Sequence, residues 1–234
     1  MTVTTAPTST GQRTGLIGNR IVLAGILVYL LEFAGFAYAG VGSLYNEPGT
    51  SPKDVLASYQ GDAGGYGFLV GWMAIVLFGR LAIIVGIRKA LRDSGRRSGL
   101  MDIAVIAMGV SVVFEVASVM MGATAAALLR SGATDGVLVA DRAAWYFNAG
   151  IYSPVAVALV LTVVAMWSSG LFPRTLCVIG SVAAVTCAGA ALLTDPAHWE
   201  TQDALSNGML AFVIWAVWTG ILLLARSTSE PSRK

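Results

Sequence analysis

Six long apolar runs, separated by short polar segments, dominate the sequence. Each run reaches or exceeds the roughly twenty residues that a helix needs to cross about 30 Å of hydrocarbon. Several are longer than this minimum, which permits tilt but fixes no angle. The pattern predicts an all-α, polytopic transmembrane bundle with spans at 21–43, 65–88, 100–128, 143–168, 173–193 and 205–226.

Composition and flanking segments fit this architecture. The 234 residues are 56% hydrophobic and 12% charged, and the mean hydropathy of +0.73 is too high for an ordinary soluble domain. No small-residue cleavage site follows the first run, so we expect a true span there and not a signal peptide. The predicted organisation is a flexible tail at 1–20, a transmembrane domain at 21–226 and a short tail at 227–234.

Basic residues are concentrated on one side of the predicted spans. An excess of Lys and Arg in short loops marks the cytoplasmic side. Both termini are therefore predicted to be cytoplasmic, in a multi-pass protein of the inner (plasma) membrane. The basic residues on this side are eleven of the fifteen in the chain: Arg13, Arg20, Arg88, Lys89, Arg92, Arg96, Arg97, Arg174, Arg226, Arg233 and Lys234.

Three ionisable residues, Glu32, Arg80 and Glu115, fall inside predicted spans. A charged side chain at the centre of a span costs at least about 2.5–3.5 kcal/mol on insertion scales. One carboxylate can pair with Arg80. The other must be protonated, wetted by a cavity or engaged with a ligand, because desolvation disfavours its charged form.

We expect Arg80 to pair with Glu115, which leaves Glu32 as the surplus acid. On this reading Glu32 is the preferred catalytic acid, and Glu115 orients it or takes up the proton at the end. Arg80 is also a candidate for holding an anionic group of a substrate. A purely structural alternative remains, in which the pair fixes helix register and Glu32 bonds to a Tyr, a Ser or a backbone carbonyl.

A second group of candidates lies at 141–154, in DRAAWYFNAGIYSP. Trp145, Asn148 and Tyr152 share one helical face and can line a substrate pocket, while Pro154 can kink the helix. The alternative is an interfacial aromatic belt with one helix-pairing Asn. Further aromatic walls for an apolar substrate are predicted from Phe36, Trp72, Phe78, Trp215 and Trp218, with Asn207.

The chain shows no pattern for a metal or another cofactor, and we predict none. His198 is the single histidine, and Cys177 and Cys187 lie about 15 Å apart along one predicted helix, too far to bridge each other. Nucleic acid is not implied. The expected partners are membrane lipids and an apolar small-molecule or lipid substrate.

Several segments carry a resemblance to known membrane proteins. The basic linker IRKALRDSGRR, the glutamate-bearing third span and the turn SSGLFPRTLCVIG resemble an uncharacterised bacterial family of six-helix membrane proteins, which implies no activity. In size, and in having mid-membrane acids among aromatic residues, the chain is also similar to small membrane-bound terpene cyclases. That likeness implies protonation-initiated cyclisation of an isoprenoid.

Three functions remain open at this point. The first is a membrane enzyme in which a neutral Glu32 or Glu115 protonates an alkene or epoxide and aromatic faces stabilise the cation. The second is a proton-coupled transporter of a small molecule or lipid, in which the same carboxyl changes protonation. The third is a non-catalytic sensor or assembly module.

Overall fold

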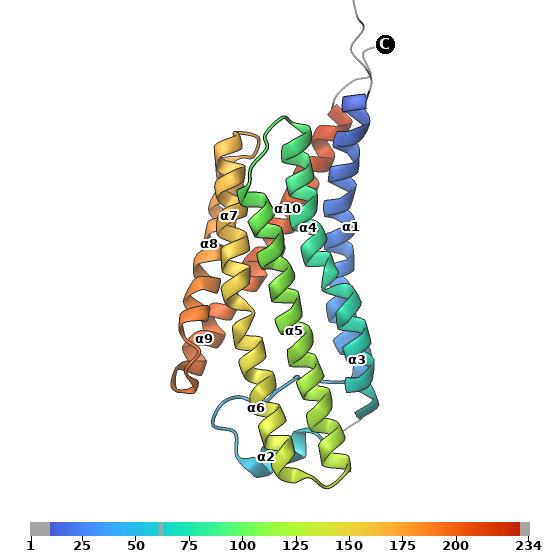
Figure 1. Ribbon diagram of the computed structural model, residues 1–234, viewed down its shortest axis with the longest axis vertical. Helices are drawn as coiled ribbons and strands as arrows, with labels where there is room; N and C mark the ends of the chain where they lie inside the picture. Colours follow the sequence, from blue (N-terminus) through green and yellow to red (C-terminus); the bar gives the residue numbers. More distant parts are fainter. Residues whose placement is uncertain (1–9, 61–62, 230–234) are drawn as a thin grey trace, which may run out of the picture.

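The computed structural model describes the backbone of residues 10–60 and 63–229, and the side chains of 20–60 and 64–226. Every regular element in these ranges is a helix (Figure 1). The prediction of six spans is confirmed, because six helical segments are long and apolar enough to cross a membrane: Arg20–Ala39, Gly64–Asp93, Leu100–Arg130, Thr134–Ser169, Arg174–Leu192 and Pro196–Arg226.

Three spans are single helices and three are divided. The undivided helices are α1 (Thr10–Ala39), α5 (Leu100–Arg130) and α8 (Arg174–Leu192). The divided spans consist of α3 (Ala63–Val76) with α4 (Phe78–Asp93), α6 (Thr134–Gly150) with α7 (Tyr152–Ser169), and η1 (Pro196–His198) and α9 (Trp199–Ser206) with α10 (Gly208–Ser229). A short helix, α2 (Pro52–Ser58), lies in the connection after α1.

Several helices extend beyond the predicted boundaries. Helix α1 begins at Thr10 and α10 ends at Ser229, so helical backbone enters both predicted tails. The rest of those tails, residues 1–9 and 230–234, lies outside the described residues. Helix α9 occupies most of the polar segment predicted as a loop at 194–204.

The two ends of the bundle differ in character. The start of α1 and the end of α10 lie at one end, together with the α4–α5 and α7–α8 connections (Figure 1). We call this the arginine-rich end, because Arg92, Arg96, Arg97 and Arg174 lie there; an ion pair between Arg88 and Asp102 joins α4 to α5 nearby. The opposite end, the loop end, holds α2 and the α5–α6 connection.

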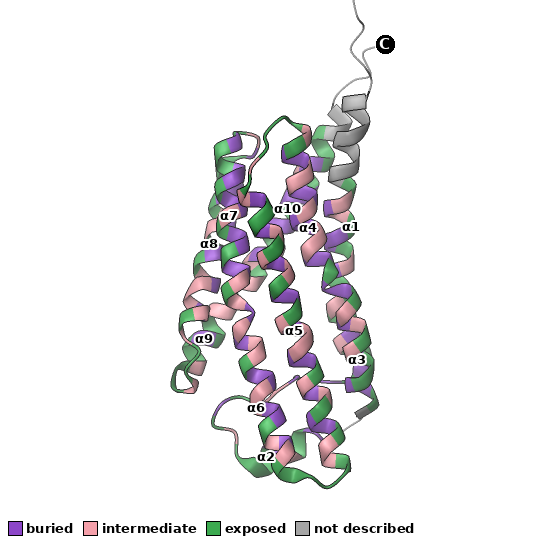
Figure 2. Ribbon diagram, in the orientation of Figure 1, coloured by how far each residue is buried: buried purple, intermediate pink, exposed green. Residues whose placement is uncertain are grey.

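The outer surface of the bundle is apolar. Exposed side chains along the spans include Leu27, Ile106 and Val185, whose exposed fractions are 66%, 66% and 70%. Buried and exposed positions recur along most of the long helices, whereas α4 is exposed only near its ends, at Phe78 and Arg92 (Figure 2). A surface of this kind suits a hydrocarbon solvent, in which apolar side chains lose nothing by facing outward.

Helices α1 and α4 pack through two glycines. A Cβ added at Gly25 would lie 2.7 Å from the Gly79 carbonyl oxygen, and one added at Gly79 would lie 2.5 Å from the Gly25 carbonyl oxygen. No side chain fits between the two backbones, which is typical of small residues at membrane helix interfaces. This contact places Tyr29 of α1 beside Arg80 of α4.

The variant Gly79→Ala is expected to lower the Tm of the purified protein in detergent. The added methyl group meets the backbone of Gly25 and Tyr29, and overpacking of this kind costs about 1–3 kcal/mol. Gly71→Ala on α3 is the matched control, because its Cβ would meet no described atom within 4 Å. The close backbone contact is contradicted if Gly79→Ala melts at or above the Tm of Gly71→Ala.

Candidate functional site

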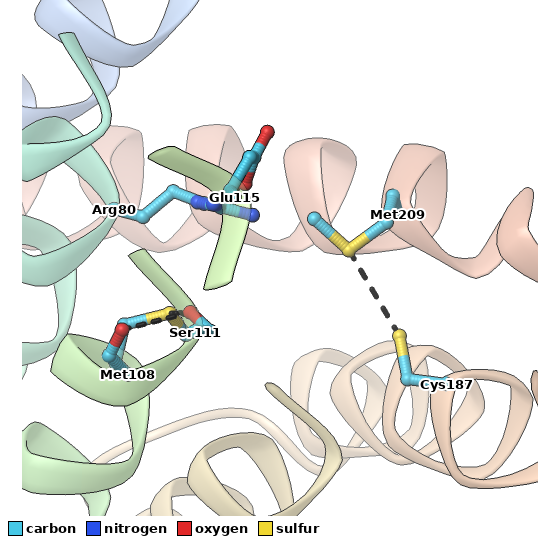
Figure 3. A network of polar contacts seen from close by, with 6 residues as sticks. All are labelled: Arg80, Met108, Ser111, Glu115, Cys187 and Met209. Carbon is cyan, nitrogen blue, oxygen red and sulfur yellow. Dashed lines mark hydrogen bonds and ion pairs between the residues drawn. The ribbon is translucent and has the colours of Figure 1, made fainter. Parts of the chain in front are cut away.

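An ion pair lies in the core of the bundle. Arg80 of α4 is bound to Glu115 of α5, which confirms the predicted pairing. The two residues are 1% and 9% exposed, and Figure 3 shows the Arg80 guanidinium lying against Glu115. Helix α4 begins at Phe78, and the Arg80 amide donates to the Leu77 carbonyl at 3.1 Å. The break between α3 and α4 therefore directly precedes the ion pair.

Aromatic rings cover the other side of Arg80. Its Cζ atom lies 5.4 Å from the centroid of the Tyr29 ring, in cation–π geometry. Tyr29 meets Phe212 edge to face at 6.0 Å between centroids, and Phe212 lies 5.9 Å from Trp215. All three rings are buried. The predicted wall residue Trp215 thus belongs to an aromatic cluster, Tyr29, Phe212 and Trp215, that begins at the ion pair.

Glu32 lies one turn along α1 from Tyr29, on the same helical face. Its Oε2 atom is buried and has no hydrogen-bond partner among the described residues, although the side chain is within electrostatic range of Arg80. Its chain neighbours Leu31 and Phe33 are exposed, at 45% and 60%. Glu32 is therefore the surplus acid, at the border between the core and the apolar surface.

Two other predicted wall residues lie close to Glu32. Trp72 of α3 donates from Nε1 to the Leu31 carbonyl at 2.9 Å and packs on Gly35. Phe36 is half-buried against the core and follows Glu32 by one turn of α1. Phe78 and Trp218 differ from these, because they are 58% and 46% exposed on the outer surface.

A pocket of about 160 Å³ lies between the 40–51 segment, α6, α7 and α9. We call it the loop-end pocket. Trp145, Asn148 and Tyr152, predicted from one helical face, all line it. The structure therefore brings these three residues together, whereas Arg80 and Glu115 of the ion pair and Trp215 of the aromatic cluster do not line this pocket. The other lining residues are Ser43, Tyr45, Glu47, Pro48, Trp199, Gln202, Asp203 and Ser206.

Hydrogen bonds tie the walls of the loop-end pocket together. Asn148 donates from Nδ2 to the Tyr45 hydroxyl at 2.7 Å. Burial raises the pKa of Tyr45, and the nearby Tyr152 and Asp203 add to the shift, so the Tyr45 hydroxyl stays protonated at physiological pH. The 40–51 segment, which forms one wall of the pocket, is thus hydrogen-bonded to α6, which forms another.

Asp141 anchors the loop that forms this wall. Its Oδ1 atom accepts from the Asn46 amide at 2.8 Å, from Asn46 Nδ2 at 2.9 Å and from the Tyr59 hydroxyl at 2.9 Å. Burial raises the pKa of Tyr59, and the negative charge of Asp141 raises it further. Asp141 precedes the predicted span at 143–168, whereas the structure places it in α6, where it is 1% exposed.

One feature of the sequence points to this role of Asp141. It precedes Trp145 by four residues, and so it shares the helical face of Trp145, Asn148 and Tyr152. Hydropathy alone does not show that an acid on that face is buried.

Two sulfur-containing side chains of α8 and α10 lie close together in the bundle. Cys187 Sγ lies 4.0 Å from Met209 Sδ (Figure 3). Cys187 is also within electrostatic range of both Tyr152 and Tyr29.

No protein-family model, curated protein or solved structure matches the chain. Within the described ranges, no three His, Cys, Asp or Glu side chains come together in a metal-binding group. Cys177 and Cys187 are both buried free thiols. Within the described chain, the residues best placed to carry a function are those of the ion pair, the aromatic cluster with Glu32, and the loop-end pocket.

The variant Glu115→Leu is expected to lower the free energy of unfolding by about 3–5 kcal/mol, because it leaves the buried Arg80 guanidinium without its counter-charge. Replacing Arg80 and Glu115 together by Leu is expected to recover much of that loss, since no unpaired buried charge remains. Unfolding in detergent, followed by tryptophan fluorescence, measures both. A double variant as unstable as Glu115→Leu would argue against the pairing.

The variant Asp141→Ala is expected to release the 40–60 segment. Hydrogen bonds to a charged acceptor are each worth about 1.5–3 kcal/mol, so trypsin should cleave after the exposed Lys53 about tenfold faster or more. Mass spectrometry of the peptides measures cleavage at that bond alone. Asp135→Ala, at an exposed acid in the first turn of the same helix, is the control. Equal cleavage of the two variants would refute the anchoring role.

Proposed function

We propose that the protein is an integral membrane enzyme that protonates a lipid-soluble, isoprenoid-type alkene, with Glu32 as the proton donor. The observation that supports this proposal is the unpartnered, buried Oε2 atom of Glu32 beside the ion pair. An ionised carboxylate without hydrogen bonds is costly in an apolar environment, so the neutral acid is the favoured form. A neutral carboxylic acid is the form that donates a proton.

In this proposal the ion pair serves as a positioning device. A buried Arg next to two acids would hold either of them ionised. Because Arg80 is bound to Glu115, Glu32 remains available to carry a proton. Glu115 therefore acts through Arg80, and Glu32 itself takes back the proton at the end of the reaction.

The proposed reaction is an isomerisation that balances without a co-reactant. The Glu32 O–H bond breaks, and the π pair of a substrate alkene forms a C–H bond with the proton, which leaves a carbocation and a carboxylate. A second alkene of the same molecule attacks the cation and closes a ring. Loss of a neighbouring proton to the Glu32 carboxylate then forms a new alkene and restores the acid.

The surroundings of Glu32 suit such a substrate. Exposed Leu31 and Phe33 flank it on α1, so a lipid-soluble molecule can reach it sideways from the hydrocarbon. The faces of the aromatic cluster, which starts at Tyr29, stabilise a positive charge. Phe36 follows Glu32 by one turn of α1, and Trp72 of α3 donates to the carbonyl of the neighbouring Leu31.

A proton-coupled carrier is the second candidate. The observation that favours it is the division of three of the six spans into shorter helices, because transporters often bind their substrates where membrane-spanning helices are broken. A carrier needs its protonatable group to communicate with an aqueous side. In that case Glu32 loads and releases a proton during transport and no bond of the substrate changes.

We also infer how the protein is oriented. The α4–α5 connection, the α7–α8 connection, the start of α1 and the end of α10 share the arginine-rich end. An excess of Lys and Arg in short loops favours the cytoplasmic side. The termini would then be cytoplasmic, and the loop-end pocket would face outward from the plasma membrane.

The variant Glu32→Gln is expected to abolish conversion of an isoprenoid alkene, with a loss of at least about 100-fold, because the amide cannot donate a proton as the acid does. Membranes containing the protein are incubated with a linear polyprene in D₂O. Mass spectrometry then measures a cyclic product, which should carry one deuterium on carbon. The Tm of the variant should equal that of the wild type, since no hydrogen bond to Oε2 is lost.

Glu200→Gln, at an exposed acid of α9, is the control and should convert the alkene at the wild-type rate. If the wild type converts no alkene while Glu32→Gln alters a proton-linked flux in vesicles, the protein is a proton-coupled carrier and the enzyme function is refuted. If Glu32→Gln changes neither conversion nor flux and lowers only the Tm, both functions are refuted and the acid is structural.

A further inference from the structure

The acids at the mouth of the loop-end pocket are not balanced by bases. Glu47 comes from the 40–51 segment and Asp203 from α9, and both are exposed. The described lining contains no Lys, Arg or His. Two carboxylates from distant parts of the chain thus face one concave space. A pocket lined by charges of one sign concentrates ions of the opposite charge.

Aromatic rings form the walls behind these acids. Four aromatic side chains, Tyr45, Trp145, Tyr152 and Trp199, line the pocket. Trp145 is only 5% exposed, so its ring lies in the interior. The faces of such rings attract a cation, and cages of this kind are the usual means by which proteins recognise alkylated ammonium groups.

Four polar groups of the lining donate hydrogen bonds to other groups of the protein. Asn148 donates to the Tyr45 hydroxyl, and Gln202 donates to the Ala190 carbonyl at 3.3 Å. The hydroxyls of Ser43 and Ser206 donate to the carbonyls of Tyr45 and Asp203 at 2.6 Å each. The pocket is therefore rich in acceptors, which suits a ligand that carries positive charge and donors.

The volume limits the size of the ligand. A cavity of about 150 Å³ holds a molecule the size of benzene, and the loop-end pocket has about 160 Å³. A compact organic cation fits this space, whereas a nucleotide, a peptide or a long acyl chain does not.

We propose that the loop-end pocket binds a small alkylated ammonium cation of the size of choline. The carboxylates of Glu47 and Asp203 attract the charge, and the rings of Trp145 and Trp199 accept the alkyl groups in place of water. This site is independent of the proton-donating role of Glu32. It uses residues at the loop end, and Glu32 does not line it.

Choline binding to the full chain in maltoside detergent tests the proposal, with the change in tryptophan fluorescence as the readout. The comparison ligand is 3,3-dimethylbutan-1-ol, which has the shape of choline without its charge. Choline is expected to bind at least about fivefold more tightly than the neutral analogue. Equal affinity of the two ligands, or no binding of choline, overturns the proposal.

Two pairs of variants assign the binding to this pocket. Asp203→Asn is expected to weaken choline binding about two- to fivefold, while Glu200→Gln on the same helix leaves it unchanged. Trp199→Leu is expected to weaken binding by a similar factor, and Trp199→Phe, which keeps a ring face, should retain most of it. Choline affinity that is the same in Asp203→Asn as in Glu200→Gln overturns the assignment.

A further experiment distinguishes a lipid headgroup from a free solute as the natural ligand. The protein is placed in nanodiscs made with phosphatidylcholine or with phosphatidylglycerol, and free choline is titrated into each. Weaker choline binding in phosphatidylcholine supports the site as one for a lipid headgroup. Equal binding in both lipids supports a free solute.

Discussion

Arg80 and Glu115 form an ion pair inside an apolar bundle, and the packing of the helices around it depends on that pair. A lone guanidinium in hydrocarbon is costly, so α4 and α5 must present the two groups to each other at the same depth. The pair fixes the height of α4, and the contact of Gly25 with Gly79 then fixes α1 beside it. The position of Glu32 follows from these two contacts.

The loop end depends on a second buried charge. Asp141 gathers three donors from the segment after α1 and so holds it against α6. Without that anchor the pocket would lose the wall that carries Tyr45 and Glu47. The molecule thus has one charge centre for the interior of the bundle and another for its loop end.

The architecture was predictable from sequence because hydrocarbon imposes length and apolarity on every span, and the pairing of Arg80 was predictable because charges inside a span are few. The partnership of Trp145, Asn148 and Tyr152 followed from helical periodicity. The role of Tyr29 was not predictable, and for Asp141 the helical face that it shares with Trp145 was the one available signal. Each role depends on which helices are neighbours, and Asp141 has the same sequence surroundings as an exposed acid. The sequence has 27 glycines and does not show which of them make close helix contacts, so the contact of Gly25 with Gly79 was not predictable either.

Each divided span contains a tighter turn at its break. The Arg80 amide bonds to Leu77, the Ile151 amide to Asn148 and the Leu210 amide to Asn207, each three residues back. A three-residue turn rotates the chain by about 20° more per residue than an α-helical one. The second half of each divided span is therefore rotated about its axis relative to an unbroken α-helix. Straightening the turn at Leu77 would swing Arg80 about the axis of α4 and away from Glu115, so the winding of that span and the position of its charge are coupled.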